Sequence, residues 1–310
     1  MDTVYHYTSP QGAFDILRNK TLRFTDCQYL NDMGEFVYVR EPLKEAYNKI
    51  RSEGNEETHN TDNFLDSFFL SPFEDFHSRP DRRSKSGLFS IGWPSYLRYF
   101  VLCASENADN INMWNYYVKD GAYRGYNLGL RPNVIQEYFE QMGNSSITIK
   151  SGSVIYDRAL QIDMFYDKLK ELISKFDQQI STLAKGADDS PAIDEFQDSL
   201  SEYINEQKLF FKNPGIASER EYRFVLKIRT DFSESYDQRT RKGFRVGSNG
   251  VIIPYIEWSF GDDLKSTLLD QITLSPMIEP ELAEESFKQF LTSDVYRNIK
   301  IQPSSLKLRY

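Results

Sequence analysis

The sequence of 310 residues is 40% hydrophobic and 27% charged, a composition that is typical of globular proteins and excludes a largely disordered chain. Its net charge of −9 at pH 7 argues against nucleic-acid binding through the overall electrostatic field, although a local basic patch could still bind it. Two cysteines are too few for a disulfide scaffold, and no run approaches the roughly 18 apolar residues of a membrane span. The start "MDTVYHYTSP" does not resemble a signal peptide. We therefore expect a cytoplasmic protein without a membrane partner.

The first predicted element is a short strand over residues 4–8 that ends at Pro10, because these residues alternate in character. On such a strand His6 points to the opposite face from Tyr5 and Tyr7. Taken alone, His6 is explained by a hydrogen bond to a neighbouring strand, and only its context suggests more.

The next elements are short. Ala13, Phe14 and Leu17 recur at helical spacing, and residues 21–25 alternate as a second strand. A loop at Asn31 and Asp32 precedes a predicted helix. The segment from about residue 51 to about residue 92 is polar, and we expect loops there.

The strongest strand pattern is the nearly continuous apolar run from Tyr99 to Ala104, as expected for a buried central strand. A short helix follows over "NINMWNYYV". Further strands are predicted over these segments: 123–130, 153–156, 219–230, 250–260 and 268–276. Strands mixed with flanking helices indicate the α+β class.

An αα-hairpin is predicted as an insertion at about residues 158–209. Apolar residues from Ile162 to Leu183 recur at steps of three and four, and a break at "AKGADDSP" follows. Ser190 can cap a second helix with Pro191 at its first position. We therefore expect a single domain over residues 1–310 that carries this insertion and the polar segment.

Two glutamates, Glu219 and Glu221, are separated by one residue where a strand is predicted to begin. The usual explanation is a solvated strand edge. On a strand, however, both carboxylates would share a face, which is unfavourable unless a cation, a sugar hydroxyl or a substrate compensates.

The order of short motifs resembles a bacterial family of uncharacterised proteins, domain of unknown function 2971. The segments that carry the resemblance are "YHYTS…GAFDILRNKTLRFTD…LNDMGEF", "FVLCASE…MWNYY…RGYNLGL", "FFKNPGIASEREYRFVL" and "IIPYI…QITLSP". They cover most of the chain.

A second resemblance is to the ADP-ribosyltransferases that carry a His-Tyr-Glu arrangement. "HYTS…AFDILRNKTL" is similar to their first strand and helix, in which a histidine is followed two residues later by threonine or serine. "CASENADNINMWNYY" is similar to the strand, serine and helix before their stacking tyrosine, and "EREYRF" to their glutamate-x-glutamate segment. No glycine-rich dinucleotide or phosphate loop is present. The resemblance implies an ADP-ribosyltransferase-like mixed sheet with the αα-hairpin inserted.

This resemblance also implies roles in the transfer of ADP-ribose from NAD, which is a substrate there. His6, with Thr8 on the same strand, would bind the adenosine ribose. Tyr116 or Tyr117 would stack on the nicotinamide ring, since an aromatic face binds a cationic ring well.

The same resemblance places Ser105 at the exit of the central strand, among the residues that bind NAD, although Ser105 is equally explained as a helix cap. Glu221 would stabilise the oxocarbenium-like charge, as a carboxylate does in glycoside hydrolysis. Glu219 would orient the acceptor.

The function expected from the sequence is therefore NAD-dependent ADP-ribosyl transfer or NAD hydrolysis. Resemblance alone suggests a bacterial toxin or phage-defence effector. A protein side chain, a nucleic-acid base and water all remain open as acceptor. The oligomeric state is not predicted.

Two alternatives stay open. Asp32, Glu35, Glu219 and Glu221 could bind a divalent metal for phosphodiester cleavage, although no histidine or glutamate-x-lysine pair accompanies them. A catalytically silent module could instead hold a nucleotide or partner without needing Glu221.

Overall fold

The computed structural model describes these ranges of the chain: 2–30, 38–53, 97–118, 124–142, 146–183, 188–229, 237–247, 249–291 and 299–307. The chain divides into two compact units. Unit 1 comprises Met1–Asn31, Ser95–Val154 and Ala217–Tyr310, and unit 2 comprises Asp32–Pro94 and Ile155–Ile216. Most of the predicted polar segment lies outside the described residues.

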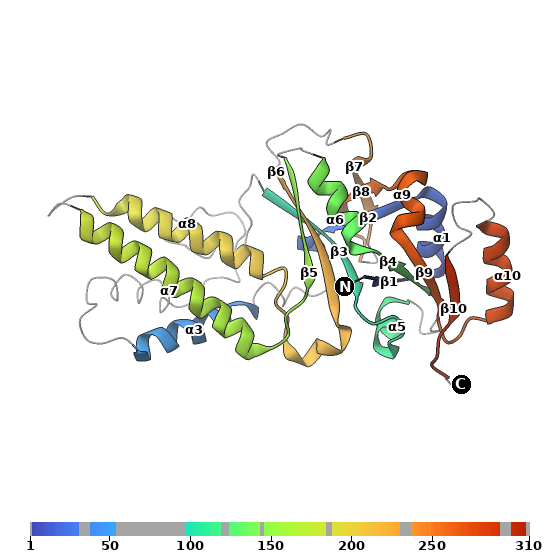
Figure 1. Cartoon of the computed structure of the whole chain (residues 1–310), viewed down its shortest axis with the longest axis horizontal. Helices are drawn as coiled ribbons and strands as arrows, with labels where there is room; N and C mark the ends of the chain where they lie inside the picture. The colour runs from blue at the N-terminus through green and yellow to red at the C-terminus, as the bar shows by residue number, and fades with distance from the viewer. Residues whose placement is uncertain are drawn as a thin grey trace. The chain divides into compact units, whose positions relative to one another are not determined.

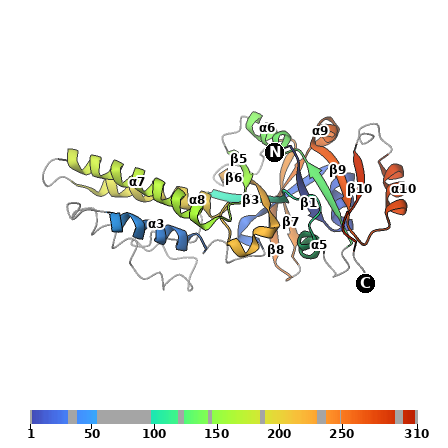
Figure 2. The same cartoon turned by 60° about the horizontal axis from the view of Figure 1, so that its bottom comes forward.

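Unit 1 is built on a mixed sheet (Figures 1 and 2). Its strands among the described residues are β1 (Val4–Thr8), β2 (Thr21–Asp26), β3 (Leu97–Ser105), β4 (Tyr126–Leu130), β5 (Ile147–Ser153), β6 (Glu221–Arg229), β7 (Thr240–Val246), β8 (Ile252–Ser259), β9 (Leu269–Leu274) and β10 (Lys300–Pro303). The order is β10-β9-β4-β1-β3-β2-β8-β7, with β6 on β3 and β5 on β6. The pair β9–β10 is parallel and the other pairs are antiparallel, so the α+β prediction is confirmed.

Strand β3 is where the sheet branches. One of its edges pairs with β6 along its whole length, from Leu97 opposite Arg229 to Ser105 opposite Glu221. The other edge is shared between β1, which pairs at one position, and β2, which pairs at two. Strand β3 therefore joins β1, β2 and β6, and its end at Ser105 is the point where β1 and β6 both meet it.

Among the described residues of unit 1, five α-helices accompany this sheet: α1 (Pro10–Asn19), α5 (Ile111–Tyr117), α6 (Pro132–Gln141), α9 (Gly261–Leu268) and α10 (Pro280–Phe290). Helix α1 begins where Ser9 Oγ accepts a hydrogen bond from the Gly12 N–H at 3.1 Å, and it ends at Lys20, whose φ of 56° is left-handed. The main core includes Leu17, Leu102 and Trp258.

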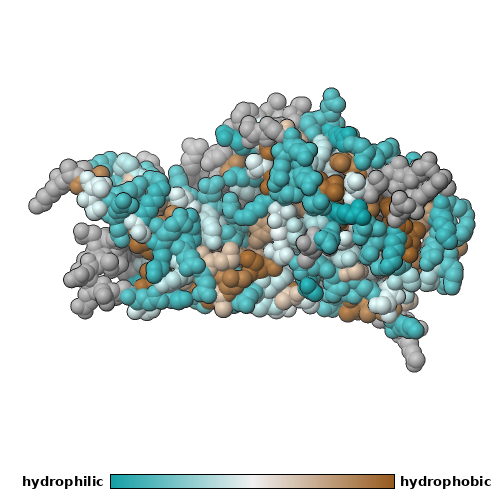
Figure 3. Space-filling model, in the orientation of Figure 1, coloured by the Kyte–Doolittle hydropathy of each residue, from teal (hydrophilic) through white to brown (hydrophobic). Residues whose placement is uncertain are grey.

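Unit 2 contains three helices among its described residues: α3 (Arg40–Glu53), α7 (Arg158–Thr182) and α8 (Ser190–Gln207). Helices α7 and α8 lie side by side (Figures 1 and 2), which confirms the predicted αα-hairpin. Phe165 and Phe176 of α7 are buried in one cluster with Phe196 and Leu200 of α8. The surface of α7 that faces the viewer in Figure 3 is mostly hydrophilic, as expected for an amphipathic helix.

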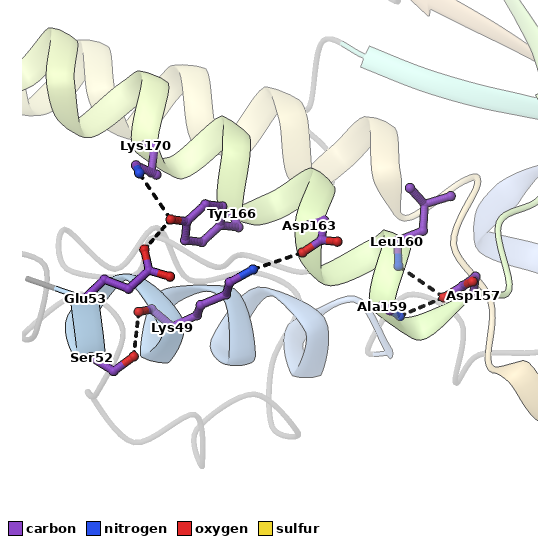
Figure 4. A network of polar contacts seen from close by, with 9 residues as sticks. All are labelled: Lys49, Ser52, Glu53, Asp157, Ala159, Leu160, Asp163, Tyr166 and Lys170. Carbon is purple, nitrogen blue, oxygen red and sulfur yellow. Dashed lines mark hydrogen bonds and ion pairs between the residues drawn. The ribbon is translucent and has the colours of Figure 1, made fainter.

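Helix α3 completes this cluster, a contact that the sequence did not predict. It contributes the buried side chains of Leu43 and Tyr47. Polar contacts also link α3 to α7 (Figure 4), including the pair of Lys49 Nζ and Asp163 Oδ1 at 3.2 Å and the hydrogen bond from the Tyr166 hydroxyl to Glu53. Because these ion-pair residues are exposed, the apolar contacts hold the three helices together.

Several boundaries differ from expectation. The strand expected at 153–156 is instead β5, which ends at Ser153, and Ile155 makes only an isolated bridge to Phe211. The N-cap position of α8 is Asp189, with Ser190 already helical. Within the described ranges, no helix is long and apolar enough to cross a bilayer.

Candidate functional site

Three strands that carry predicted site residues, β1, β3 and β6, meet at the end of β3. Ser105 is opposite Tyr5 of β1 and opposite Glu221 of β6. Directly opposite residues of antiparallel strands share a face, so Tyr5, Ser105 and Glu221 lie on one face of the sheet and His6 lies on the other. His6 and Glu221 therefore do not converge on one side of the sheet, as the joint roles in NAD binding that the resemblance implies would require.

His6 is half-buried and fixed in one orientation. Its Nδ1 lies 2.8 Å from the main-chain oxygen of Cys103. A carbonyl oxygen can only accept, so Nδ1 carries the proton and Nε2 presents a lone pair. Burial lowers the pKa of His6, and the Cys103 carbonyl opposes this only in part. His6 is therefore a neutral hydrogen-bond acceptor, and no described residue donates to its Nε2.

Glu221 is buried and paired. Its carboxylate accepts two hydrogen bonds from Arg223, Nε to Oε1 at 2.9 Å and Nη2 to Oε2 at 2.9 Å. Both side chains are 2% exposed. The pair forms because residues two apart on a strand share a face. Arg223 is the residue that the sequence interpretation missed, although the Glu-x-Arg spacing predicts such a pair.

Glu219 does not share a strand face with Glu221, contrary to expectation. It ends the 3₁₀ helix η3 (Pro214–Glu219), and β6 begins only at Glu221. Arg220 between them has a φ of 43°, a left-handed conformation that is uncommon for arginine. Its main chain is held there, because the Glu106 N–H donates to the Arg220 oxygen at 2.7 Å.

Ser105 is buried and joins β3 to the segment before β6. Its hydroxyl donates to the main-chain oxygen of Glu219 at 2.7 Å and accepts from the Asn107 N–H at 3.1 Å. With both roles filled and no exposed surface, Ser105 positions the backbone of Glu219.

The two predicted stacking tyrosines, Tyr116 and Tyr117, are adjacent on helix α5 but differ in environment. Asn110 caps it by accepting from the Asn112 N–H at 2.9 Å. Tyr117 packs with Tyr7 and Trp114 on the Tyr5 face of the sheet. Tyr116 is 61% exposed, so Tyr116 is the one available to a ligand, but it does not share the face of His6.

Thr8 lies on the His6 face by strand alternation, at the start of α1. Its Oγ1 lies only 2.2 Å from the position that a Cβ on Gly12 would occupy, so glycine at position 12 leaves room for the Thr8 hydroxyl. His6 and Thr8 thus remain together, as the resemblance implies.

Of the acidic residues proposed for a metal site, Asp32 and Glu35 lie outside the described residues. In the part of the chain that the structure describes, no group of three or more His, Cys, Asp or Glu side chains is arranged to hold a metal ion. The Glu221 carboxylate is bound to Arg223 instead.

Comparison with known proteins supports one of the two resemblances. Residues 113–224 match the model of a family described as "Protein of unknown function (DUF2971)". The match covers Tyr116, Glu219, Glu221 and Arg223 but not His6. No curated protein and no solved structure matches the chain.

Proposed function

We propose that this chain binds a ribose-containing nucleotide, with NAD as the preferred ligand, through the β1 face that carries His6 and Thr8, and that Glu221 serves the fold. The observation that carries the proposal is the fixed tautomer of His6, with Nδ1 donating to Cys103 and Nε2 left as an acceptor. Ribose hydroxyls are donors, and a half-buried neutral imidazole accepts from them without competition from a charge.

The test is equilibrium binding of labelled NAD to the purified chain, with free nicotinamide measured in the same samples. His6→Ala should weaken binding by about 3- to 10-fold, the effect of one hydrogen bond to a ligand. Tyr116→Phe is the matched control and should bind as the wild type does, because Tyr116 lies on α5, which packs on the face of the sheet opposite to His6. Equal affinity of His6→Ala and wild type would exclude this face as the site.

A second candidate is ADP-ribosyl transfer or NAD hydrolysis at the β3–β6 junction. It is favoured by the left-handed Arg220 between Glu219 and Glu221, because such backbone strain is common at active sites. In that reaction the bond from ribose C1′ to the nicotinamide nitrogen breaks, nicotinamide leaves with the electron pair, and the acceptor oxygen or nitrogen bonds to C1′ and loses its proton.

The second candidate requires the Glu221 carboxylate to face positive charge on the ribose. Arg223 already neutralises that carboxylate, which is why binding without Glu221 is preferred. Release of nicotinamide, or transfer of label, that disappears in folded Glu221→Gln protein would favour the enzyme. If Glu219 serves the acceptor, Glu219→Gln should lose transfer and keep hydrolysis.

A further inference from the structure

We propose that the outer face of the β2–β8–β7 part of the sheet binds single-stranded nucleic acid. The face is defined by six residues: Arg23, Arg241, Gly243, Arg245, Tyr255 and Glu257. All belong to unit 1. None of these residues belongs to the β1 face that carries His6 and Thr8.

Pairing register places these residues in rows across three strands. Arg23 is opposite Glu257, and Glu257 is opposite Arg241. The next row joins Tyr255 to Gly243. Their neighbours Leu22, Phe24, Ile256 and Trp258 alternate with them and enter the main core, so the arginine face is the one that points away from the core.

A buried carboxylate holds two of the arginines in position. Glu257 is 4% exposed and accepts from Arg23 Nε at 2.9 Å and from Arg241 Nε at 2.8 Å. Burial acts to raise the pKa of Glu257, but these hydrogen bonds outweigh it, so its pKa lies below the ordinary value and the group stays ionised. One carboxylate thus serves two guanidinium groups, which leaves a net positive charge.

The arginines still have donors to offer. Their side chains are 44% exposed for Arg23 and 79% for Arg241. Among the described residues, both Nη groups of Arg23 and the Nη1 group of Arg241 make no hydrogen bond. Arg245 lies further along the same face, is exposed, and has no side-chain partner in the described ranges. Phosphate oxygens match such fixed, unfilled guanidinium donors.

An aromatic group lies between these charges. The Tyr255 ring lies across Gly243, since a Cβ at position 243 would be 2.4 Å from Tyr255 Cζ. The Arg23 guanidinium lies over this ring at 4.8 Å from its centroid. Bases of single strands stack on aromatic rings and on guanidinium planes, whereas paired bases in a duplex do not offer their faces.

The charge of the arginine face and its aromatic ring distinguish between the possible ligands. Three arginines against one carboxylate form a local positive surface on a chain with a net charge of −9, so a second copy of this chain is a poor overall match. A duplex would use the arginines and not the stack. A single-stranded RNA or DNA uses both, with its phosphates on the arginines and a base on the Arg23–Tyr255 stack.

The experiment is fluorescence anisotropy of labelled oligo-U and oligo-dT of about 15 nucleotides, a length within the usual site sizes. Binding should weaken with salt with a slope of about −2 in log affinity against log salt, from three phosphate contacts. Arg245→Gln, which breaks no side-chain hydrogen bond or ion pair among the described residues, should reduce that slope by about 0.7. Tyr255→Leu should weaken binding at least about 5-fold, and Tyr255→Phe should restore it.

The matched control is Arg18→Gln, which removes the same charge from an exposed position of α1. Circular dichroism and tryptophan fluorescence verify that each variant is folded. The proposal is overturned if neither oligonucleotide binds at roughly 50 mM salt. It is also overturned if Arg245→Gln and Tyr255→Leu bind like the wild type, or if a duplex binds as tightly as the single strands and Tyr255→Leu leaves both unchanged.

Discussion

Replacing Glu221 by Gln removes one charge from a pair that is enclosed at the start of β6. At the observed 2.9 Å contacts, the attraction between the two charges is about 6 kcal/mol at an effective dielectric constant of about 20. Much of this offsets the cost of desolvating both groups. Removing one partner leaves the buried Arg223 without the Glu221 carboxylate, so we expect Glu221→Gln to lower the free energy of unfolding by about 3 to 5 kcal/mol.

A double-mutant cycle separates this pair from its surroundings. Arg223→Met should be destabilising by a similar amount, because the buried Glu221 carboxylate then loses the Arg223 guanidinium. Both side chains have further interactions, so the double variant should recover part of the loss. We expect a coupling energy of about 2 kcal/mol or more between the two positions.

Urea unfolding followed by tryptophan fluorescence is the assay, because Trp114 and Trp258 are both fully buried in unit 1. For a slope of about 3 kcal/mol per molar urea, the midpoint should fall by about 1 to 1.7 M. An unchanged midpoint for Glu221→Gln, together with loss of NAD turnover, would refute the structural role and return Glu221 to catalysis.

Three other predictions concern His6, Asp109 and the helical insertion. Burial lowers the pKa of His6 from 6.5, so below that pH the unfolded chain takes up a proton that the folded chain does not. The free energy of unfolding should therefore fall as pH falls from 6.5 toward the folded pKa, and it should fall less steeply in His6→Gln. Urea titrations at several pH values can measure this difference. Asp109 has a lowered pKa because hydrogen bonds from Trp114, Ser304 and Ser305 outweigh its burial. Its contribution to the free energy of unfolding should be present above the unfolded pKa of 3.8 and be lost as pH falls through the folded pKa. Asp109→Ala should lower the free energy of unfolding by about 2 kcal/mol and make residues 304–307 more sensitive to protease. Deleting residues 158–209 should leave the tryptophan spectrum of unit 1 unchanged while exposing Leu43 and Tyr47 of α3 to a hydrophobic dye; a tryptophan spectrum of unfolded chain would contradict the independence of the unit 1 core.

Periodicity was sufficient for elements that bury a regular face. Strands β1, β2, β3 and β6 and the hairpin of α7 and α8 were predicted near their observed bounds, since their apolar residues recur at a period of two or at steps of three and four. Helices α6 and α10 were missed although each begins with a proline in its first turn, a signal the sequence does carry. Strand β7 lacks a buried alternating pattern because it lies at the end of the strand order.

The candidate site was harder to predict because it depends on register and backbone conformation. That His6 and Glu221 point to opposite faces follows from the pairing of Tyr5, Ser105 and Glu221, which no local pattern contains. The left-handed Arg220 is likewise set by the hydrogen bond from Glu106, 114 positions away. By contrast, the pair of Glu221 and Arg223 needed only the rule that residues two apart on a strand share a face.

The long separation between paired strands has a consequence for synthesis. Strand β3 ends at Ser105, and its full-length partner β6 ends at Arg229, so 229 − 105 = 124 residues are added before the pair can close. At about 5 to 20 residues per second, that delay is roughly 6 to 25 seconds. Until then the apolar residues of β3, from Tyr99 to Leu102, lack their β6 partner, while α7 and α8, adjacent in sequence, can already pair. We therefore expect a chaperone to bind ribosome-attached chains truncated before β6 more than the complete folded chain.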